Sequence, residues 1–515
     1  MEKNRISAEY LHALQSIYHL IDSRGILVNQ ERLEVTREYI DRKTKELCNS
    51  IGNYWGVSVY VGSLNKPDVA LGRSINLNAS SGANTVLAFL RDEKDYKIPK
   101  VNSRDEEGNF ISKESLNELA LQKIYSTNQF NILGGDPAIR DLLKIRELTT
   151  LKSRYINANL FHHSSGDNLF LTNYNVAGTV TGRRGSRKHS FGFGGNAQNF
   201  PKHGELAKIY RRCLVARPGK IFLFVDQIQA EDWPTSALAQ NNEALFDLQN
   251  SVDRHRKLAC AIFGLPWDHY SESEWKESLE RYLGKKTRHA NNYGMRGNTM
   301  SDALAKEGHS LTPAQCQAIL DIVNKTDPNV ENVFHKYIRE CLHNERLIRT
   351  PTGRERYFFG LRAGDKGNNS KIYNEGYSYI PQSVVGDNTG FTVFELETTS
   401  GFGSGFIVQE GHDSITQELS CDCDVLWDQL QRTRQCFSRI FRFHNGIEIE
   451  IPVEGEIGFD FATTITLKNL QTGSKKLEDI RYTDLQAALH KLEEAQEIER
   501  VKECGSCRAT GLRHM

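Results

Sequence analysis

Apolar residues recur every three or four positions over much of the first third of the chain, which is the period of amphipathic α-helices. The period is clearest in residues 10–21 and 31–54, so residues 1–160 are expected to be mainly helical. Residues 221–225, in contrast, form an unbroken apolar run that is typical of a strand buried on both faces. Residues 406–408 and Ile415 flank a short polar turn, which predicts a strand-turn-strand unit. The pattern indicates an α+β protein.

Each predicted strand region carries an aspartate where its apolar run ends. Asp226 follows Val225, and Asp413 lies in the polar turn before Ile415. A single aspartate in such a place is usually only a turn residue. Two of them, however, offer the carboxylate oxygens that Mg²⁺ prefers. The sequence therefore predicts a metal site formed by Asp226 and Asp413.

A basic helix is predicted between these aspartates. Arg281, Lys285, His289 and Tyr293 recur every four residues and would share one helix face. Such a face is often only solvated. Cations beside an aromatic ring also suit a nucleoside triphosphate, whose phosphates need neutralising while its base or sugar needs a flat surface. Carboxylates for a metal and cations for phosphate together favour phosphoryl or nucleotidyl transfer.

Composition restricts the possible functions only slightly. The 515 residues are enough for several subdomains, and 65 basic residues balance 65 acidic ones, so any nucleic-acid footprint must be local. Basic clusters occur in residues 183–188, 208–217, 285–288 and 346–356. Ten cysteines, mostly scattered singly, favour a reducing compartment. The apolar runs are too short to span a bilayer, so a cytoplasmic location without membrane contact is expected, in the host cytoplasm if the protein is viral.

The order of these motifs resembles the family A DNA polymerases, the group of bacterial DNA polymerase I and many phage replicases. The segments that carry the resemblance are Thr-Gly-Arg at 181–183, Asn-Ala-Gln-Asn at 196–199, Asp226 to Glu231, Asp-Arg-His at 253–255, Lys285 to Tyr293, Gly-Arg at 353–354, Pro-Gln at 381–382 and His412-Asp413. The resemblance implies a right-hand polymerase fold with an antiparallel palm sheet, helical fingers and a helical thumb. It divides the chain into a thumb-like region (1–160), palm (161–231), fingers (232–345), palm (346–464) and a C-terminal extension (465–515).

The resemblance also implies a role for each matched residue. Asp226 and Asp413 would hold two Mg²⁺ ions, which Mn²⁺ can replace, while Glu231 would exclude a ribose 2′-hydroxyl. Lys285, His289 and His255 would meet the triphosphate, and Tyr293 would favour acceptance of sugars that lack a 3′-hydroxyl. The implied contacts to primer-template DNA are Arg183, Gln198, Asn199, Arg354, Gln382 and His412. Deoxynucleoside triphosphates are the implied substrates.

Several positions depart from the family pattern. His289 stands where a lysine is usual, so either His289 or the neighbouring Lys286 would contact the phosphates. Gly297 replaces a tyrosine, Trp233 an arginine, and Ser414 an auxiliary acid. Gln382 is preferred to Ser383 as the minor-groove residue.

Further expectations concern the ends of the chain and other functions. Thumb-like sequence begins near residue 1, so proofreading is expected to lie on a separate exonuclease, and a processivity subunit is a further expected partner. Cys504, Cys507 and His514 are too few ligands for a closed zinc site. Two alternatives stay open: a single-subunit RNA polymerase, against which Glu231 argues, and a non-catalytic DNA-binding paralogue, against which Asp226 and Asp413 argue. The absence of a Gly-x-x-x-x-Gly-Lys-[Ser/Thr] loop disfavours a nucleotide-hydrolysing motor.

Overall fold

The computed structural model describes residues 5–66, 74–78, 85–94, 96–104, 110–127, 136–202, 204–309, 311–362, 366–399 and 406–510. The chain folds into two compact units. Unit 1 contains the chain up to Arg32, residues 158–294 and the chain from Ile322. Unit 2 contains residues 33–157 and 295–321.

A five-stranded sheet organises unit 1. Its strands, in spatial order, are β14 (Phe406–Glu410), β15 (Ser414–Ser420), β11 (Lys220–Gln227), β18 (Val453–Gly458) and β19 (Thr464–Thr466). Every neighbouring pair is antiparallel. The prediction of an α+β fold with an antiparallel sheet is therefore confirmed, and the apolar run at 221–225 forms the central strand.

β11 is apolar throughout because both of its faces are covered. Ile221, Leu223 and Val225 enter a large apolar core. On the opposite face the rings of Phe222 and Phe224 pack against Phe461, with ring centroids 4.9 and 5.1 Å apart. Alternate side chains of a strand point to opposite faces, so covering both faces removes any need for polar positions.

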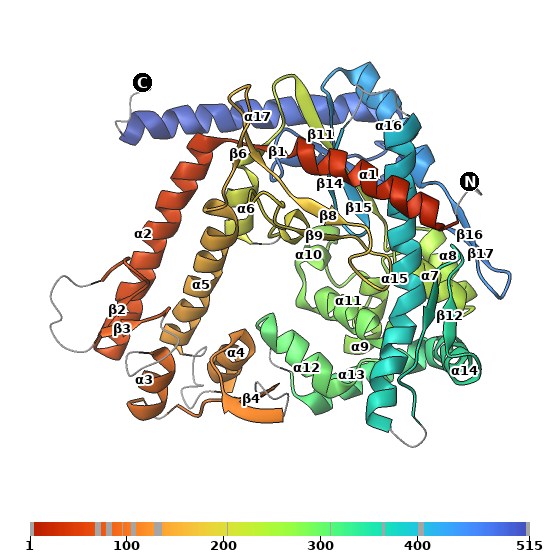
Figure 1. The fold of residues 1–515 in the computed structure, drawn as a ribbon, viewed down its shortest axis with the longest axis horizontal. Coiled ribbons are helices and arrows are strands. Elements are labelled where there is room, and N and C mark those ends of the chain that lie inside the picture. Colours follow the sequence, from red (N-terminus) through yellow and green to blue (C-terminus); the bar gives the residue numbers. More distant parts are fainter. Residues whose placement is uncertain are drawn as a thin grey trace. The chain divides into compact units, whose positions relative to one another are not determined.

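Four helices of unit 1 contribute to that core. They are α1 (Ala8–Arg24), α15 (Lys366–Thr399), α16 (Cys423–Phe437) and α17 (Tyr482–Thr510). Figure 1 shows α15 as one long helix beside α1 and α16. α15 continues through Pro381, although proline removes a helix hydrogen bond. Nearly all residues from 379 to 393 are buried, so packing on both sides sustains the helix there.

A second core of unit 1 joins the N-terminal half of α15 to four helices, which are α7 (Asp232–Leu238), α8 (Asn242–Gln249), η3 (Val330–His335) and α14 (Lys336–Asn344). Three further helices of unit 1 follow α8 in the chain: α9 (Arg254–Phe263), α10 (Glu272–Glu277) and α11 (Leu279–Asn292). α9 and α11 approach closely at Gly284, where a Cβ atom would lie 2.4 Å from the His255 carbonyl oxygen. The contact therefore requires glycine.

Shorter elements complete unit 1. They are β1 (Ile26–Val28), β6 (Phe161–His162), β7 (Asn168–Phe170), β8 (Asn173–Asn175), β9 (Gly185–Arg187), η2 (Ala197–Asn199), α6 (Glu205–Arg211), β10 (Leu214–Val215), β12 (Leu347–Arg349), β13 (Glu355–Tyr357), β16 (Ile440–Arg442), β17 (Glu448–Glu450) and η4 (Leu477–Asp479).

Unit 2 is mainly helical, as the period of residues 31–54 predicts. Its elements are most of α2 (Gln30–Trp55), β2 (Ser58–Tyr60), β3 (Ser74–Asn76), α3 (Val86–Asp92), β4 (Lys100–Arg104), β5 (Phe110–Glu114), α4 (Glu118–Thr127), α5 (Pro137–Leu151), η1 (Lys152–Ile156), α12 (Gly297–Lys306) and the first part of α13 (Pro313–Thr326). Within the unit, Ser50 bonds Asp141 at 2.8 Å and Lys123 bonds Asp302 at 2.7 Å. Residues 295–321 thus pack with residues 33–157, whereas the division by resemblance groups them with 232–345.

Candidate active site

Asp226 and Asp413 lie close together at one edge of the contact between β11 and β15. Asp226 is the penultimate residue of β11, and Asp413 lies in the turn that leads into β15. Asp226 stands opposite Ser414 in the antiparallel register, and the amide of Gln227 donates to the Asp413 carbonyl oxygen at 3.1 Å. The structure therefore brings together the two aspartates that the sequence predicts as metal ligands.

A third carboxylate, Glu454, lies on the other side of Asp226. Glu454 is the direct partner of Asp226 on β18, so both side chains project from the same face of the sheet. Sequence reasoning assigned no role to Glu454, because only the strand register reveals it. In the chain it is one of several acidic residues that alternate with apolar ones from 448 to 456.

The surroundings of Asp226 are unfavourable for negative charge. Its side chain remains accessible to solvent, yet protein atoms crowd it. This partial burial, followed by the charges of Asp413 and Glu454, raises the pKa of Asp226 well above its usual range, while Lys202 and Lys285 act in the opposite direction. A cation bound here would relieve that repulsion.

The two aspartates fit a hard divalent cation. Among the residues that the structure describes, no group of three or more His, Cys, Asp or Glu side chains is arranged to hold a metal ion. Mg²⁺ typically takes only one or two protein carboxylates and completes its shell with water and substrate phosphates. Asp226 and Asp413 supply that number of carboxylates from the end of β11 and the turn before β15.

Gln227 fixes the backbone around this pair. Its side-chain amide donates to Thr389 Oγ1 at 3.0 Å and to the Asp413 carbonyl oxygen at 3.3 Å, and its carbonyl oxygen accepts from Asn388 Nδ2 at 2.8 Å. Gln227 is 3% exposed. One buried side chain thus connects β11, α15 and the turn that carries Asp413.

Glu231 is held between segments that are distant in sequence. Its Oε1 atom accepts a hydrogen bond from Arg183 and its Oε2 atom accepts one from the Tyr293 hydroxyl. Nδ1 of His289 lies 4.0 Å from the same Oε2 atom. The structure therefore gathers three other predicted site residues around the Glu231 carboxylate.

The cationic side chains of α11 differ in exposure and in their partners. Lys285 is exposed, and its positive charge acts to lower the pKa of Asp226. His289 is partly exposed and lies near Glu231. The Lys286 ammonium lies over the Tyr282 ring, 5.6 Å from its centroid, and partial burial followed by the charge of Lys285 lowers its pKa. Arg281 bonds Asp253 at 2.6 Å. Tyr293 caps the helix rather than continuing it, so the predicted four-residue face ends at His289.

Asp232, next to Glu231, connects the site to the helices behind it. It is 4% exposed and faces Arg288 at 3.6 Å, Arg254 at 3.8 Å and the Asn292 amide at 3.2 Å. Despite burial, the Arg288 and Arg254 guanidinium groups hold the pKa of Asp232 below its usual value. Sequence reasoning missed this cluster, which links α7, α9 and α11.

His255 lies behind this face of α11. It is 7% exposed, and its ring centroid is 6.2 Å from that of His289. Burial lowers the pKa of His255 to about 3. Its predicted contact with a triphosphate remains a prediction, and in this structure the side chain is shielded.

The residues predicted to contact nucleic acid fall into two groups. Gln198 and Arg354 have inward partners: Gln198 bonds the backbone of Ser186 at 2.9 Å, and Arg354 bonds Asp387 at 2.7 Å. Arg354 also covers Gly182, where a Cβ atom would lie 2.3 Å from its guanidinium carbon. Accessible to solvent are Asn199 and, in part, Gln382 and His412.

Two of these accessible residues, Gln382 and His412, can be described further. Ser383 is fully buried, which supports the choice of Gln382 as the side chain that can reach a ligand. Burial, followed by the charge of Arg183, lowers the pKa of His412, and its Nδ1 atom has no hydrogen-bond partner within the described structure. The individual DNA contacts remain predictions.

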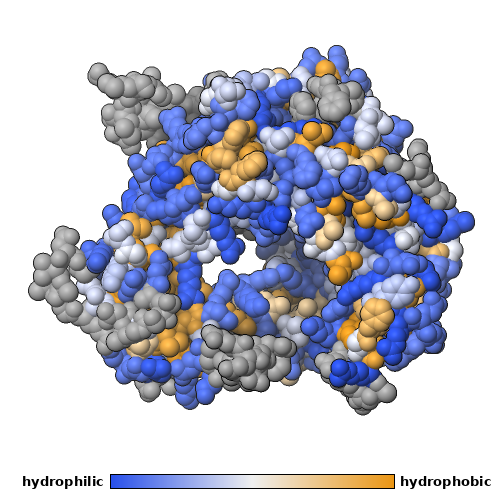
Figure 2. Space-filling view, viewed as in Figure 1, coloured by the Kyte–Doolittle hydropathy of each residue, from blue (hydrophilic) through white to orange (hydrophobic). Residues whose placement is uncertain are grey.

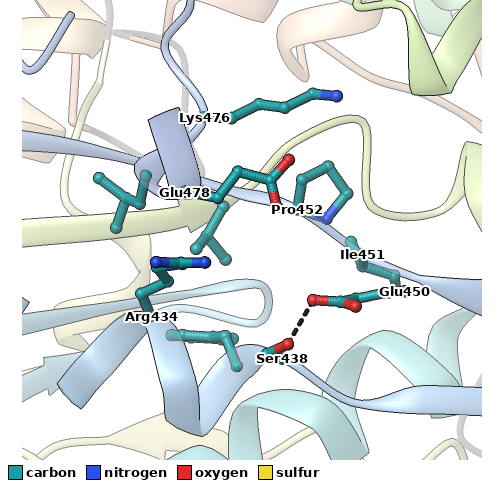
Figure 3. A pocket seen from close by; sticks show the side chains of 10 residues that line it. Arg434, Ser438, Glu450, Ile451, Pro452, Lys476 and Glu478 are labelled. Carbon is teal, nitrogen blue, oxygen red and sulfur yellow. Dashed lines mark hydrogen bonds between the residues drawn. The ribbon is translucent and has the colours of Figure 1, made fainter. Parts of the chain in front are cut away.

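Other features lie apart from this site. A small pocket between α16, β17 and η4 is lined by Arg434, Glu450 and Lys476 and encloses about 10 Å³, close to the space of one water molecule (Figure 3). The face drawn in Figure 2 is mostly hydrophilic, with apolar residues in separate small groups. The side chains of Cys504, Cys507 and His514 lie outside the described residues. Across the part of the chain that is described, no helix is long and apolar enough to cross a membrane.

Asp226 at the end of β11 and Asp413 in the turn before β15 thus lie together, and the charge of Lys285 on α11 acts on Asp226. The sequence profile described as DNA polymerase family A matches residues 66–398, well over half of the chain. The match includes Asp226 and ends before Asp413. This chain belongs to DNA polymerase family A.

Individual proteins show the same relationship. The chain is 26% identical over 285 residues to the thermostable DNA polymerase I of Thermus aquaticus, covering 55% of this chain and 32% of that protein. It is 31% identical over 199 residues to DNA polymerase I of Chloroflexus aurantiacus, covering 38% and 18%. A DNA polymerase of Bacillus phage SP01 is 20% identical over 487 residues, covering 86% and 49%. The chain thus spans a third or less of the bacterial relatives and about half of the phage relative.

A solved structure confirms the predicted right-hand fold. The POL domain of Pol1 from M. smegmatis, in complex with DNA primer-template and dNTP, matches with a TM-score of 0.66 at 16% sequence identity, over 88% of this chain and 70% of that chain.

Proposed function

We propose that this protein is a template-directed DNA polymerase that adds deoxynucleotides to the 3′ end of a primer. The observation that carries the proposal is the placement of Asp226, at the end of β11, beside Asp413, in the turn before β15, with Glu231 and the cations of α11 in the same unit. Membership of DNA polymerase family A supports the same reaction.

Asp226 and Asp413 would hold two Mg²⁺ ions, which Mn²⁺ can replace. When bound, the ions would supply activation of the primer 3′-hydroxyl and charge stabilisation at the departing pyrophosphate. Such cations would favour the ionised form of Asp226, whose pKa is raised by burial and by the neighbouring carboxylates. The reaction forms a bond from the primer 3′ oxygen to the α-phosphorus and breaks the bond between the α- and β-phosphates.

The remaining residues orient the substrates and handle charge. Lys285 and His289 would neutralise the β- and γ-phosphates, and a protonated His289 can donate its proton to the leaving pyrophosphate. Glu231 would occupy the space next to C2′ of the incoming sugar and so favour deoxynucleotides. Arg183, which bonds Glu231, would contact the primer end through the minor groove.

Primer extension tests the proposal. Purified protein is incubated with an end-labelled primer on a defined template, Mg²⁺ and the four deoxynucleotides, and single nucleotides are then omitted in turn. When one nucleotide is omitted, we expect extension to stop just before the first template position that requires it. Folded protein that binds primer-template but never extends it would favour the non-catalytic DNA-binding alternative. Faster extension with ribonucleotides would favour the RNA polymerase alternative.

A further inference from the structure

Tyr293 and Arg183 hold the Glu231 carboxylate from two sides. The Tyr293 hydroxyl donates to Oε2, and the Arg183 guanidinium donates to Oε1. The side chains of Glu231 and Arg183 are 16% and 20% exposed, so both hydrogen bonds are largely shielded from water. Hydrogen bonds to a charged group are stronger than neutral ones, and two of them on different oxygens fix the carboxylate plane.

The backbone that carries Tyr293 is itself constrained. Tyr293 ends α11, with φ −108° and ψ 16°, and Gly294 then takes a left-handed φ of 65°. A Cβ atom on Gly294 would lie 2.8 Å from Asn374 Oδ1 and 2.9 Å from the Tyr377 ring, both on α15. The end of α11 is therefore packed closely against α15, and Tyr293 has a fixed base.

We propose that Tyr293 is a specificity-determining positioning residue, whose hydroxyl holds Glu231 in the orientation that excludes a ribose 2′-hydroxyl. The proposal rests on the proposed DNA polymerase function and assigns the hydroxyl an action through Glu231, not a direct contact with the nucleotide. Without that hydroxyl, the hydrogen bond that the Glu231 carboxylate keeps among the described residues is the one from Arg183, and His289 Nδ1 lies 4.0 Å from the freed oxygen. One carboxylate oxygen is then released, and the side chain can turn away from the incoming sugar.

Single-nucleotide incorporation measures this role. For the wild type and Tyr293→Phe, kcat/KM is determined for a deoxynucleotide and for the matching ribonucleotide on the same template. We expect the deoxy-to-ribo ratio to fall roughly tenfold in Tyr293→Phe, the effect of losing one hydrogen bond to a charged group. The deoxynucleotide kcat/KM should change much less, whereas general damage to the fold would lower both values together.

Two comparisons separate this role from others. Tyr482→Phe is the matched control, because it removes a tyrosine hydrogen bond to Asp424, 2.5 Å long, between α17 and α16; its ratio should equal that of the wild type. In a Glu231→Ala background, Tyr293→Phe should change the ratio no further, because the group that it positions is absent.

Three results would overturn the inference. One is a ratio in Tyr293→Phe that equals the wild-type ratio, and another is an equal effect of Tyr293→Phe with and without Glu231. The third is a change confined to dideoxynucleotide acceptance, which would assign the hydroxyl to direct contact with the sugar. If Tyr293→Phe incorporates deoxynucleotides normally and its deoxy-to-ribo ratio is unchanged, this inference alone fails. If the folded wild-type protein incorporates no deoxynucleotide, the proposed function fails as well.

Discussion

Among the positions that depart from the family pattern, His289 bears most directly on the chemistry, because it stands where a lysine is usual. A lysine is permanently charged near neutral pH, whereas histidine carries a proton only in part of that range. His289 lies 4.0 Å from Glu231, whereas the ammonium of Lys286 is directed over Tyr282. The positions of the two side chains favour His289 as the phosphate contact.

Substitutions at these two positions can decide between them. We expect His289→Ala to lower kcat for deoxynucleotide incorporation by roughly a hundredfold, the scale of a lost proton donor. His289→Lys should retain most of the activity, and Lys286→Ala should change kcat only a few-fold. Rapid-quench measurement of single additions provides the comparison. A larger loss in Lys286→Ala than in His289→Ala would contradict the assignment.

His255 predicts a pH effect on stability. Burial, opposed by Asp232 and Asp253 and assisted by Arg288 and His289, lowers its pKa to about 3 in the folded protein. The unfolded chain binds a proton at about pH 6.5, so the stability contributed by neutral His255 is complete above that pH and is lost as the pH falls towards 3.

The test compares the wild type with His255→Asn by denaturant unfolding at about pH 7.5 and about pH 5.5. Between these values the wild type should lose about 1.4 kcal/mol of unfolding free energy relative to the variant. Parallel pH dependence of the two proteins would show that His255 titrates normally in the fold.

At the scale of elements, β11, α15 and the β14–β15 turn depend on one another through Gln227. Replacing Gln227 by leucine removes one hydrogen bond each from Thr389, Asn388 and the turn that carries Asp413. We expect Gln227→Leu to destabilise the protein by about 1–3 kcal/mol and to lower incorporation roughly tenfold. Thermal unfolding and primer extension measure the two effects, with the exposed Gln486→Leu as control. Equal stability and activity in both variants would argue against a connecting role.

Elements with a strong local pattern could be predicted from sequence. The apolar run at 221–225 predicts a strand and forms β11. The periodic segments 10–21 and 31–54 predict helices and form most of α1 and α2. The start of α17 at Tyr482 depends on local contacts: residues 477–479 form a separate 3₁₀ turn, and Asp484 accepts from the Arg481 amide. The continuation of α15 through Pro381 could not be predicted either, since tertiary packing overrides the local preference there.

The candidate site was predictable as a set of residues but not as a set of contacts. Asp226, Asp413 and Glu231 stand out by their places after strands and in motifs. Glu454 becomes visible only through the register of β18, and the bonds from Arg183 and Tyr293 to Glu231 join segments far apart in the chain. Such long-range pairings are set by the packing of whole elements, which local sequence does not encode.

At the scale of the whole molecule, the chain passes between its two units four times, after Arg32, Asn157, Gly294 and Asp321. Asp226, Asp413, Glu231 and Tyr293 all belong to unit 1. The proposed metal-dependent site with its two aspartates therefore lies within one compact unit and can be tested by single substitutions there.

The most direct test is primer extension in Mg²⁺ by the wild type, Asp226→Asn, Asp413→Asn and the control Asp428→Asn, which changes an exposed aspartate of α16. Binding to labelled primer-template is measured alongside, so that a loss of folding is recognised. We predict that Asp226→Asn and Asp413→Asn each lose roughly a thousandfold in extension rate while binding is retained, and that Asp428→Asn matches the wild type. Extension at near wild-type rates by either Asp226→Asn or Asp413→Asn would contradict the account.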